Sequence, residues 1–142
     1  MRVVAVSGGF DPVHIGHLNL FREAKALGDK LVVIVNNDHW LMSKKGYVFM
    51  NEKERAEIVK AVRYVDEVLV TGHPEDPSDM SVCADLERLQ PDIFANGGDR
   101  KPDGDPIPEV DLCQRLGIKI VYNVGGRKTQ SSSELVKRVK TG

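Results

Sequence analysis

The chain has 142 residues, of which 41% are hydrophobic and 29% are charged, and its formal net charge at pH 7 is −1. This length fits one domain spanning residues 1–142, and the balanced charge argues against a nucleic-acid-binding domain, in which basic residues dominate. The isolated Cys83 and Cys113 argue against a disulfide framework and favour a cytoplasmic protein, and no run approaches the roughly 20 apolar residues of a membrane helix.

Apolar runs alternate with helical patterns along the whole chain. In chain order the sequence predicts strand 2–6, helix 12–28, strand 30–35, a polar loop over 36–49, helix 51–62, strand 66–70, a loop over 71–79, helix 80–89, strand 92–99, a loop over 100–108, helix 109–117, strand 118–126 and helix 131–140. The first helix carries Asp11 as its expected cap and Pro12 at its expected first position.

This alternation predicts a single α/β domain with a doubly wound, five-stranded parallel sheet and helices on both faces, which is a Rossmann-like architecture. Ligands of such sheets lie at the carboxyl ends of the strands. The segments 8–17, 44–45, 97–100 and 125–133 all follow a predicted strand or the loop after one. We therefore expect them to converge on one edge of the sheet.

The stretch SGGFDPVHIGHLNL (7–20) has the features of a phosphate site. Gly8 and Gly9 allow a sharp turn and a close backbone approach to a ligand, directly before the positive end of a helix. His14 and His17 are three residues apart, so they share a helix face, and Gly16 between them leaves room for a base or ribose. We expect both imidazoles to donate hydrogen bonds to phosphate oxygens.

Other interpretations of these histidines remain open at this point. They could be unrelated surface residues, or a metal pair with Asp11 as the third ligand. A non-catalytic nucleotide-binding module on the same sheet would need the glycines but not both histidines. The pair therefore favours an enzyme over a binding module.

The motif GGFDPVHIGH after a strand resembles the signature of the nucleotidylyltransferase superfamily with an HxGH motif. The likeness is closest to cytidylyltransferase-like enzymes such as glycerol-3-phosphate cytidylyltransferase and the nucleotidyl-transfer domain that forms ADP-heptose. It extends through ERAEIVKAVRYVDEVLV, DIFANGGDR and GGRKTQSSSELV, so it covers nearly the whole chain. Class I aminoacyl-tRNA synthetases share the HIGH motif, but 142 residues are too few for such an enzyme.

The resemblance implies a role for each matching residue. His14 and His17 would hold the triphosphate and stabilise the transition state, and either Lys44 or Lys45 would bridge the α-phosphate and the phosphate of the acceptor, with Lys45 favoured as catalytic. The remaining expected nucleotide contacts come from the N-terminal motif (Gly8, Gly9, Phe10, Asp11 and Gly16), from Arg55, from the turn at Gly98 and Asp99, and from Arg127, Ser131, Ser132 and Ser133.

The expected reaction transfers a nucleotidyl group from a nucleoside triphosphate to a phosphate monoester and releases pyrophosphate. The resemblance favours CTP as donor, followed by ATP, and a small sugar phosphate or polyol phosphate as acceptor. Magnesium would be bound mainly through the triphosphate, with no dedicated protein site. The family resemblance also implies a homodimer, for which Trp40 is a candidate contact.

Overall fold

The structure, a computed structural model, describes residues 1–97 and 108–125. The elements of this part of the chain are, in order, β1 (Val3–Gly8), α1 (Ile15–Lys25), β2 (Lys30–Val35), α2 (Asp38–Lys45), α3 (Glu52–Lys60), β3 (Glu67–Val70), α4 (Cys83–Leu89), β4 (Ile93–Ala95), α5 (Pro108–Leu116) and β5 (Lys119–Val121). The expected closing helix at 131–140 lies outside the described residues.

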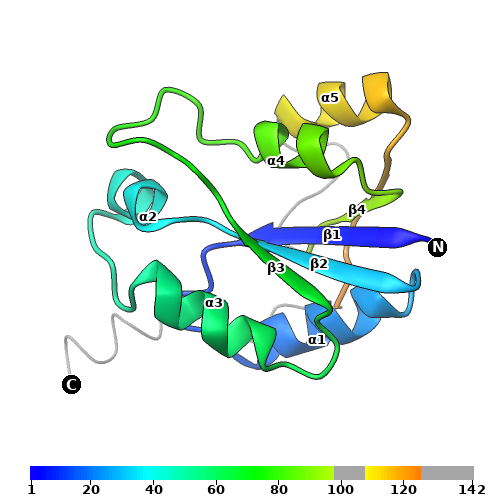
Figure 1. Cartoon of the computed structure of the whole chain (residues 1–142), viewed down its shortest axis with the longest axis horizontal. Helices are drawn as coiled ribbons and strands as arrows, with labels where there is room; N and C mark the ends of the chain where they lie inside the picture. The colour runs from blue at the N-terminus through cyan, green and yellow to red at the C-terminus, as the bar shows by residue number, and fades with distance from the viewer. Residues whose placement is uncertain (98–107, 126–142) are drawn as a thin grey trace.

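Within the described residues the strands form one five-stranded parallel sheet in the order β3-β2-β1-β4-β5. Helices α1 and α3 cover one face of the sheet, and α4 and α5 cover the other (Figure 1). Helix α2 lies beyond the carboxyl ends of the strands (Figure 1). The Rossmann-like α/β architecture predicted from the sequence is confirmed.

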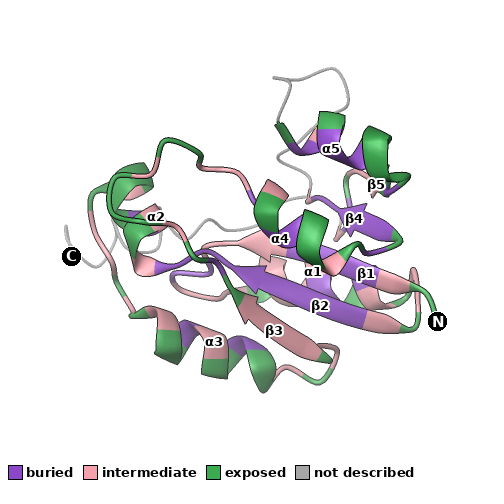
Figure 2. Ribbon diagram, turned by 45° about the horizontal axis from the view of Figure 1, so that its top comes forward, coloured by how far each residue is buried: buried purple, intermediate pink, exposed green. Residues whose placement is uncertain are grey.

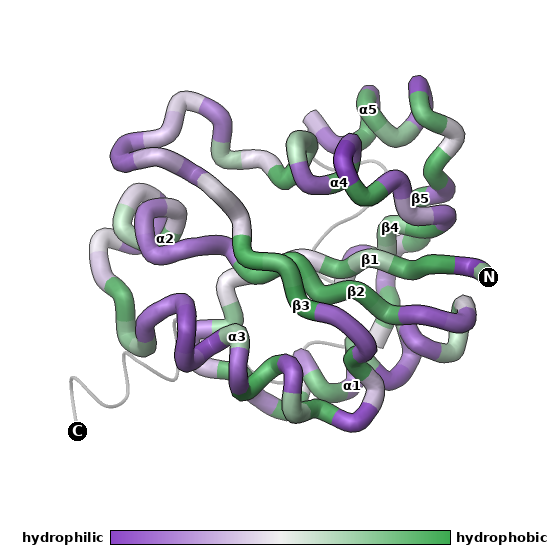
Figure 3. The backbone as a smooth tube through the Cα atoms, in the orientation of Figure 1, coloured by the Kyte–Doolittle hydropathy of each residue, from purple (hydrophilic) through white to green (hydrophobic). Residues whose placement is uncertain are grey.

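Apolar side chains on the two faces of the sheet form two separate clusters. The cluster beneath α1 and α3 includes Val4, Val6 and Phe21, and the cluster beneath α4 and α5 includes Ile34 and Phe94. The strands at the centre of the sheet are accordingly the most buried and most apolar part of the chain (Figures 2 and 3). This two-sided burial explains why β1 and β2 are near-continuous apolar runs.

The first helix starts later than its sequence predicts. Helix α1 begins at Ile15, and its N-cap is His14, so the expected cap at Asp11 and the expected first position at Pro12 are wrong. The peptide bond between Asp11 and Pro12 is cis. Asp11 does not cap the helix because its carboxylate binds amides of a distant loop, as described below.

The segment expected to be a polar loop contains helix α2. Its N-cap is Asn37, whose side chain accepts a hydrogen bond from the backbone N–H of Trp40, and Gly46 ends it in a left-handed conformation with φ of 80°. These capping residues were a usable signal in the sequence. The apolar periodicity of this segment was too weak to indicate a helix, because Leu41 is the one fully buried side chain of α2.

None of the helices within residues 1–97 and 108–125 is long and apolar enough to cross a membrane.

Gly125 brings the chain after β5 into close contact with α1. Its φ is 90°, and a Cβ atom at this position would lie 2.9 Å from both Cα and N of Leu20. Backbone atoms of a helix cannot move aside as a flexible side chain can. The packing of this segment against α1 therefore requires glycine at position 125.

We predict that Gly125→Ala destabilises the fold far more than Gly117→Ala. Both glycines have positive φ, but a Cβ at Gly117 meets nothing within 4 Å. Gly117→Ala should lower the free energy of unfolding by about 1 kcal/mol through backbone strain. Gly125→Ala should lower it by about 3 kcal/mol, because steric overlap is added to that strain. Urea unfolding of the two variants measures the difference, and equal losses would contradict the close contact.

Candidate active site

The two histidines of the HxGH motif form the start of α1. Nδ1 of His14 accepts a hydrogen bond from the backbone N–H of Gly16 at 3.1 Å, and Nδ1 of His17 accepts one from the backbone N–H of His14 at 3.2 Å. The ring centroids are 3.9 Å apart with an interplanar angle of 26°, so the imidazoles are stacked. The two rings therefore lie side by side at the start of α1, although His14 is the N-cap and not part of the first helical turn.

This capping arrangement determines which nitrogen of each ring carries the proton. A ring nitrogen that accepts a backbone N–H must itself be unprotonated in the neutral imidazole. The hydrogen-bond network therefore assigns the proton to Nε2 in both His14 and His17. The N–H donor of each ring is therefore at Nε2, and its donation to phosphate oxygens stays a prediction.

The glycines of the motif make room for side chains of this chain. A Cβ at Gly8 would lie 2.9 Å from the ring of Phe10, a Cβ at Gly16 would lie 2.9 Å from the ring of His14, and a Cβ at Gly9 would lie 3.1 Å from Leu41 of α2. The sequence predicted that a ligand takes the space beside these glycines. In the structure, the glycines allow the histidine loop to pack tightly on itself and on α2.

Phe10 connects the histidine pair to the core. It is 2% exposed and has a positive φ of 52°. Its ring meets His17 edge-on at 4.9 Å between centroids and meets Phe21 at 5.4 Å. The side chain of Phe10 therefore supports His17, while its backbone remains the part proposed to meet the nucleotide.

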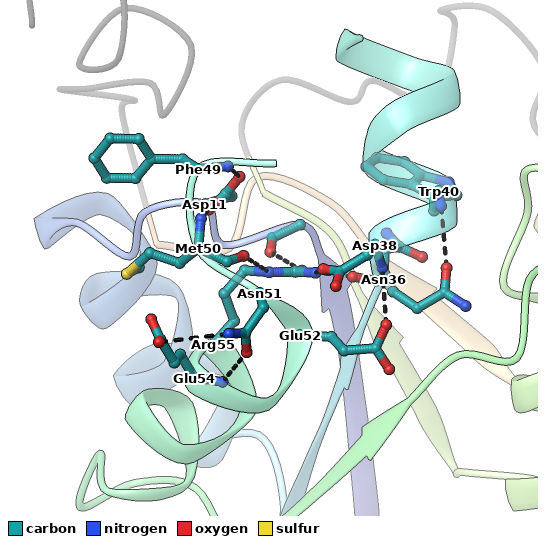
Figure 4. A network of polar contacts seen from close by, with 12 residues as sticks. Asp11, Asn36, Asp38, Trp40, Phe49, Met50, Asn51, Glu52, Glu54 and Arg55 are labelled. Carbon is teal, nitrogen blue, oxygen red and sulfur yellow. Dashed lines mark hydrogen bonds and ion pairs between the residues drawn. The ribbon is translucent and has the colours of Figure 1, made fainter. Parts of the chain in front are cut away.

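Asp11 is completely buried, which differs from its expected role at the nucleotide. Its two carboxylate oxygens accept hydrogen bonds from the backbone N–H groups of Phe49 and Met50, each at 2.6 Å. The carboxylate thereby ties the histidine loop to the segment before α3 (Figure 4). We infer that Asp11 positions the loop and does not contact a ligand.

Arg55 is the second buried charge at this edge, with a fully buried side chain. Its guanidinium donates to the carbonyl oxygens of Gly9 at 2.7 Å, Asn36 at 2.5 Å and Met50 at 2.9 Å, and it forms an ion pair with Asp38 at 2.8 Å. These partners come from the loops after β1 and β2, from the first residue of α2 and from the segment before α3 (Figure 4). The expected contact of Arg55 with phosphate or acceptor is not supported, because its guanidinium is directed at protein carbonyls inside the fold.

Helix α2 carries the two candidate lysines in its last turn. Its first turn is held by Asp38, whose carboxylate pairs with Arg55 and whose backbone N–H donates to Glu52 at 3.1 Å. The histidine loop and the lysine helix are therefore connected through one guanidinium. Lys44 is exposed and Lys45 is half-buried.

Trp40 of α2 binds within its own chain. Its indole Nε1–H donates to the carbonyl oxygen of Met80 at 2.8 Å, in the loop that follows β3. Asn37 strengthens the same connection, since its backbone N–H donates to Thr71 and its side-chain amide donates to the carbonyl oxygen of His73. The dimer contact considered for Trp40 is therefore not needed to explain this residue.

The loop after β3 is ordered by polar contacts that the sequence did not reveal. His73 bonds the hydroxyl of Thr71 at 2.8 Å and the carbonyl oxygen of Ser81 at 3.0 Å, which closes the loop on itself. Hydrogen bonds from the side chain and backbone of Ser81 hold the pKa of Asp79 below its usual value. The loop thus presents an ionised carboxylate at the same edge of the sheet as α2.

Several expected nucleotide contacts lie outside the described residues, namely Gly98, Asp99, Arg127, Ser131, Ser132 and Ser133. After β5, Gly125 lies against the backbone of Leu20 in α1. Within residues 1–97 and 108–125, no three His, Cys, Asp or Glu side chains are arranged to hold a metal ion. A metal site formed by His14, His17 and Asp11 is also opposed by the amide contacts of Asp11 and of both Nδ1 atoms.

We predict that Arg55→Met strongly destabilises the fold, whereas Arg63→Met does not. Removing the guanidinium leaves buried carbonyl oxygens and the Asp38 carboxylate without their donor, which costs about 3 kcal/mol. Arg63 is exposed and lies over the ring of Tyr64, so its loss should cost less than about 1 kcal/mol. Chemical denaturation compares the two variants at equal net charge, and a mild effect of Arg55→Met would contradict its role as the link between loops.

The comparison with known proteins agrees with this geometry. The Cytidylyltransferase-like family profile matches residues 5–137. The chain is 40% identical to the FAD synthase of Thermococcus sibiricus, over 99% of this chain and 95% of that protein. It is 34% identical to the FAD synthase of Pyrococcus abyssi, over 96% and 90% of the two chains. It is 33% identical to the bifunctional protein HldE of Koribacter versatilis, over 90% of this chain but 26% of that protein.

A solved structure shows the same fold. It is the lipopolysaccharide core biosynthesis protein of Thermoplasma volcanium, which is 28% identical, with a TM-score of 0.69 over 90% of this chain and 99% of the other. One assignment follows from the stacked histidines of the HxGH motif, from helix α2 with its two lysines beyond the carboxyl ends of the strands, and from these similarities. The chain belongs to the Cytidylyltransferase-like family and is a nucleotidyltransferase.

Proposed function

We propose that this nucleotidyltransferase moves AMP from ATP to FMN, forming FAD and pyrophosphate. The observation that carries the proposal is the similarity to proteins named FAD synthase, which spans nearly the full length of both chains. The comparisons therefore favour ATP over CTP as the donor. They also favour FMN over the sugar phosphate or polyol phosphate expected from the sequence.

In the proposed step, a phosphate oxygen of FMN attacks the α-phosphorus of ATP in line. A new P–O bond forms the pyrophosphate bridge of FAD, and the bond from the α-phosphorus to the bridging oxygen of the β-phosphate breaks. The bond electrons leave with pyrophosphate, so no oxidant, reductant or covalent enzyme intermediate is required. Catalysis of this kind depends on positioning and on donors aimed at oxygens that gain charge.

The described residues supply such donors. The Nε2–H groups assigned to His14 and His17 would donate to oxygens of the triphosphate, and the stacked rings hold these donors in a fixed relation. Lys44 or Lys45 would neutralise charge between the α-phosphate and the phosphate of FMN. Arg55 would act indirectly, because it holds the histidine loop and the lysine helix in register.

The remaining expected contacts stay part of the proposal. The backbone of Gly9 and Phe10 would approach the nucleotide, and Gly98 with Asp99 would lie near its base and ribose. Arg127 and Ser131, Ser132 and Ser133 would bind the β- and γ-phosphates. Mg²⁺ would bind mainly through the triphosphate oxygens, as the family resemblance implies. When bound, the ion neutralises phosphate charge.

A sugar phosphate is the second candidate acceptor. It is favoured by the similarity to HldE proteins and to a lipopolysaccharide core biosynthesis protein. The HldE matches cover about a quarter of those bifunctional proteins, whereas the FAD synthase matches cover most of each chain. This difference in coverage makes FMN the first acceptor to test.

We predict that the purified protein forms FAD from ATP and FMN in the presence of Mg²⁺. The measurement is chromatographic separation of FAD from FMN together with release of pyrophosphate. CTP in place of ATP and heptose 1-phosphate or glycerol 3-phosphate in place of FMN form the comparison arms. A higher kcat/KM for a sugar phosphate than for FMN would replace the proposed acceptor with the second candidate.

We also predict that His14→Asn lowers kcat by at least about 100-fold while leaving the protein folded. Asparagine is a good N-cap, so it can still accept the Gly16 amide, but it lacks the Nε2–H donor. The thermal midpoint should therefore stay within a few degrees. His39→Asn, at an exposed position of α2, is the matched control and should keep the wild-type kcat. Unchanged turnover of His14→Asn would remove this histidine from the mechanism.

A further inference from the structure

Two buried side-chain amides lie at the carboxyl ends of β2 and β4. Asn36 is 4% exposed and Asn96 is 6% exposed. Among the residues that the structure describes, Oδ1 of Asn36 and Nδ2 of Asn96 are the buried side-chain polar atoms without a hydrogen-bond partner. A buried polar atom without a partner destabilises a fold, so its presence calls for an explanation.

The backbone of both residues continues the sheet by one position. The N–H of Asn36 donates to the carbonyl oxygen of Gly8 at 2.9 Å, and the N–H of Asn96 donates to that of Val121 at 2.8 Å. Side chains alternate between the two faces along such extended chain. The face on which each amide lies therefore follows from the strand residues before it.

Both amides lie on the face covered by α4 and α5. Ile34 and Phe94, two residues earlier on the same strands, belong to the apolar cluster of that face. Strand β1 lies between β2 and β4. Its residue Ser7 comes two positions after Ala5 of this cluster and therefore lies on the same face. We call Asn36, Ser7 and Asn96 the polar row.

The polar row lies at the switch point of the sheet. The chain passes from β1 to β2 on one side and later returns to pair β4 on the other side of β1. Ligands of doubly wound sheets bind outside the carboxyl ends of the strands at such a point. The row is also close along the chain to the histidine loop, because β1 leads from Ser7 through Gly8 into that loop.

The chemistry of the two unpartnered atoms restricts the ligand. An amide oxygen requires a donor and an amide nitrogen requires an acceptor. A phosphate offers acceptors alone, so it cannot satisfy Asn36. An adenine edge and the pyrimidine edge of a flavin each combine N–H donors with acceptors. Strands β2 and β4 are two strand spacings apart, about 10 Å, and the register places Asn36 two residues, about 7 Å, further along the sheet than Asn96. Amides staggered in this way can contact opposite ends of a fused ring.

We propose that the polar row binds the heteroaromatic ring of a substrate through Asn36 and Asn96. The ring comes from one of two sources, the adenine of ATP or the isoalloxazine of FMN, and in this form the inference rests on the proposed function. The free protein bears the destabilisation of unpaired amides, which a bound ring relieves. In this way the two amides of the polar row would select a substrate by the hydrogen-bonding groups on its ring.

The test replaces each amide by an apolar side chain of similar size. Asn36→Leu and Asn96→Leu should keep or raise the thermal midpoint, since no partner is lost within the free protein. Thr71→Val is the matched control at the end of β3. Its hydroxyl does have partners, Asn37 and His73, so this variant should lower the midpoint. Asn36→Ala and Asn96→Ala provide the same comparison if leucine prevents folding.

Binding is measured with three probes: α,β-methylene ATP, FMN through quenching of its fluorescence, and inorganic triphosphate, which has no ring. Each Leu variant should weaken one ring-bearing probe by about tenfold or more and leave triphosphate unchanged. Loss of the ATP analogue alone identifies adenine as the ring, and loss of FMN alone identifies the flavin. Wild-type binding of all three probes, or a midpoint drop as large as that of Thr71→Val, would overturn the proposal.

The outcome separates this inference from the proposed function. Wild-type protein that makes no FAD, but whose binding of the ATP analogue depends on Asn36 and Asn96, rejects the proposed acceptor and supports the polar row. Wild-type protein that makes FAD, with Leu variants that bind every probe normally, supports the proposed function and rejects the polar row.

Discussion

The carboxyl edge of this sheet depends on the burial of one guanidinium. Arg55 cannot lose its charge, so the fold must supply acceptors for its N–H groups. The acceptors are backbone carbonyls of the loops after β1 and β2, together with Met50 and the Asp38 carboxylate. Each loop is therefore held in the position that satisfies the guanidinium. Displacing one of them would leave a buried charge or carbonyl unpaired, which is why this edge is fixed before any substrate binds.

Asp11 is a buried negative charge that holds the same segment before α3 as the positive charge of Arg55. The peptide units around Met50 are held from both sides, since the Met50 N–H donates to Asp11 and its carbonyl accepts from Arg55. Two formally charged side chains thus serve the scaffold, and the proposed triphosphate contacts fall to the imidazoles and to the lysines of α2. Burial separates the charges at this edge: the buried charges order the loops, and the proposed chemistry uses the more accessible groups.

The sequence was sufficient for the features that depend on local patterns. Continuous apolar runs identified the central strands, and a spacing of three indicated that His14 and His17 lie together at the start of a helix, where they stack. It was insufficient where a polar side chain finds a distant partner. Asp11 is of a residue type that often caps helices, but it binds Phe49, 38 residues away. Arg55 binds Gly9, 46 residues away. Such pairings follow from the tertiary fold, which no local pattern contains.

The same distinction separates scaffold from binding surface at this edge. Thr71 directly follows β3, Asp11 lies in the loop after β1, and Arg55 reaches this edge from α3; all three are paired within the chain. Asn36 and Asn96 each directly follow a strand and are also buried, yet each leaves an amide atom unpaired within the described residues. Selection for stability alone would replace such amides by apolar residues, because unpaired polar atoms weaken the fold. Their presence beside a set of fully paired neighbours is therefore best explained by a partner that arrives with the substrate.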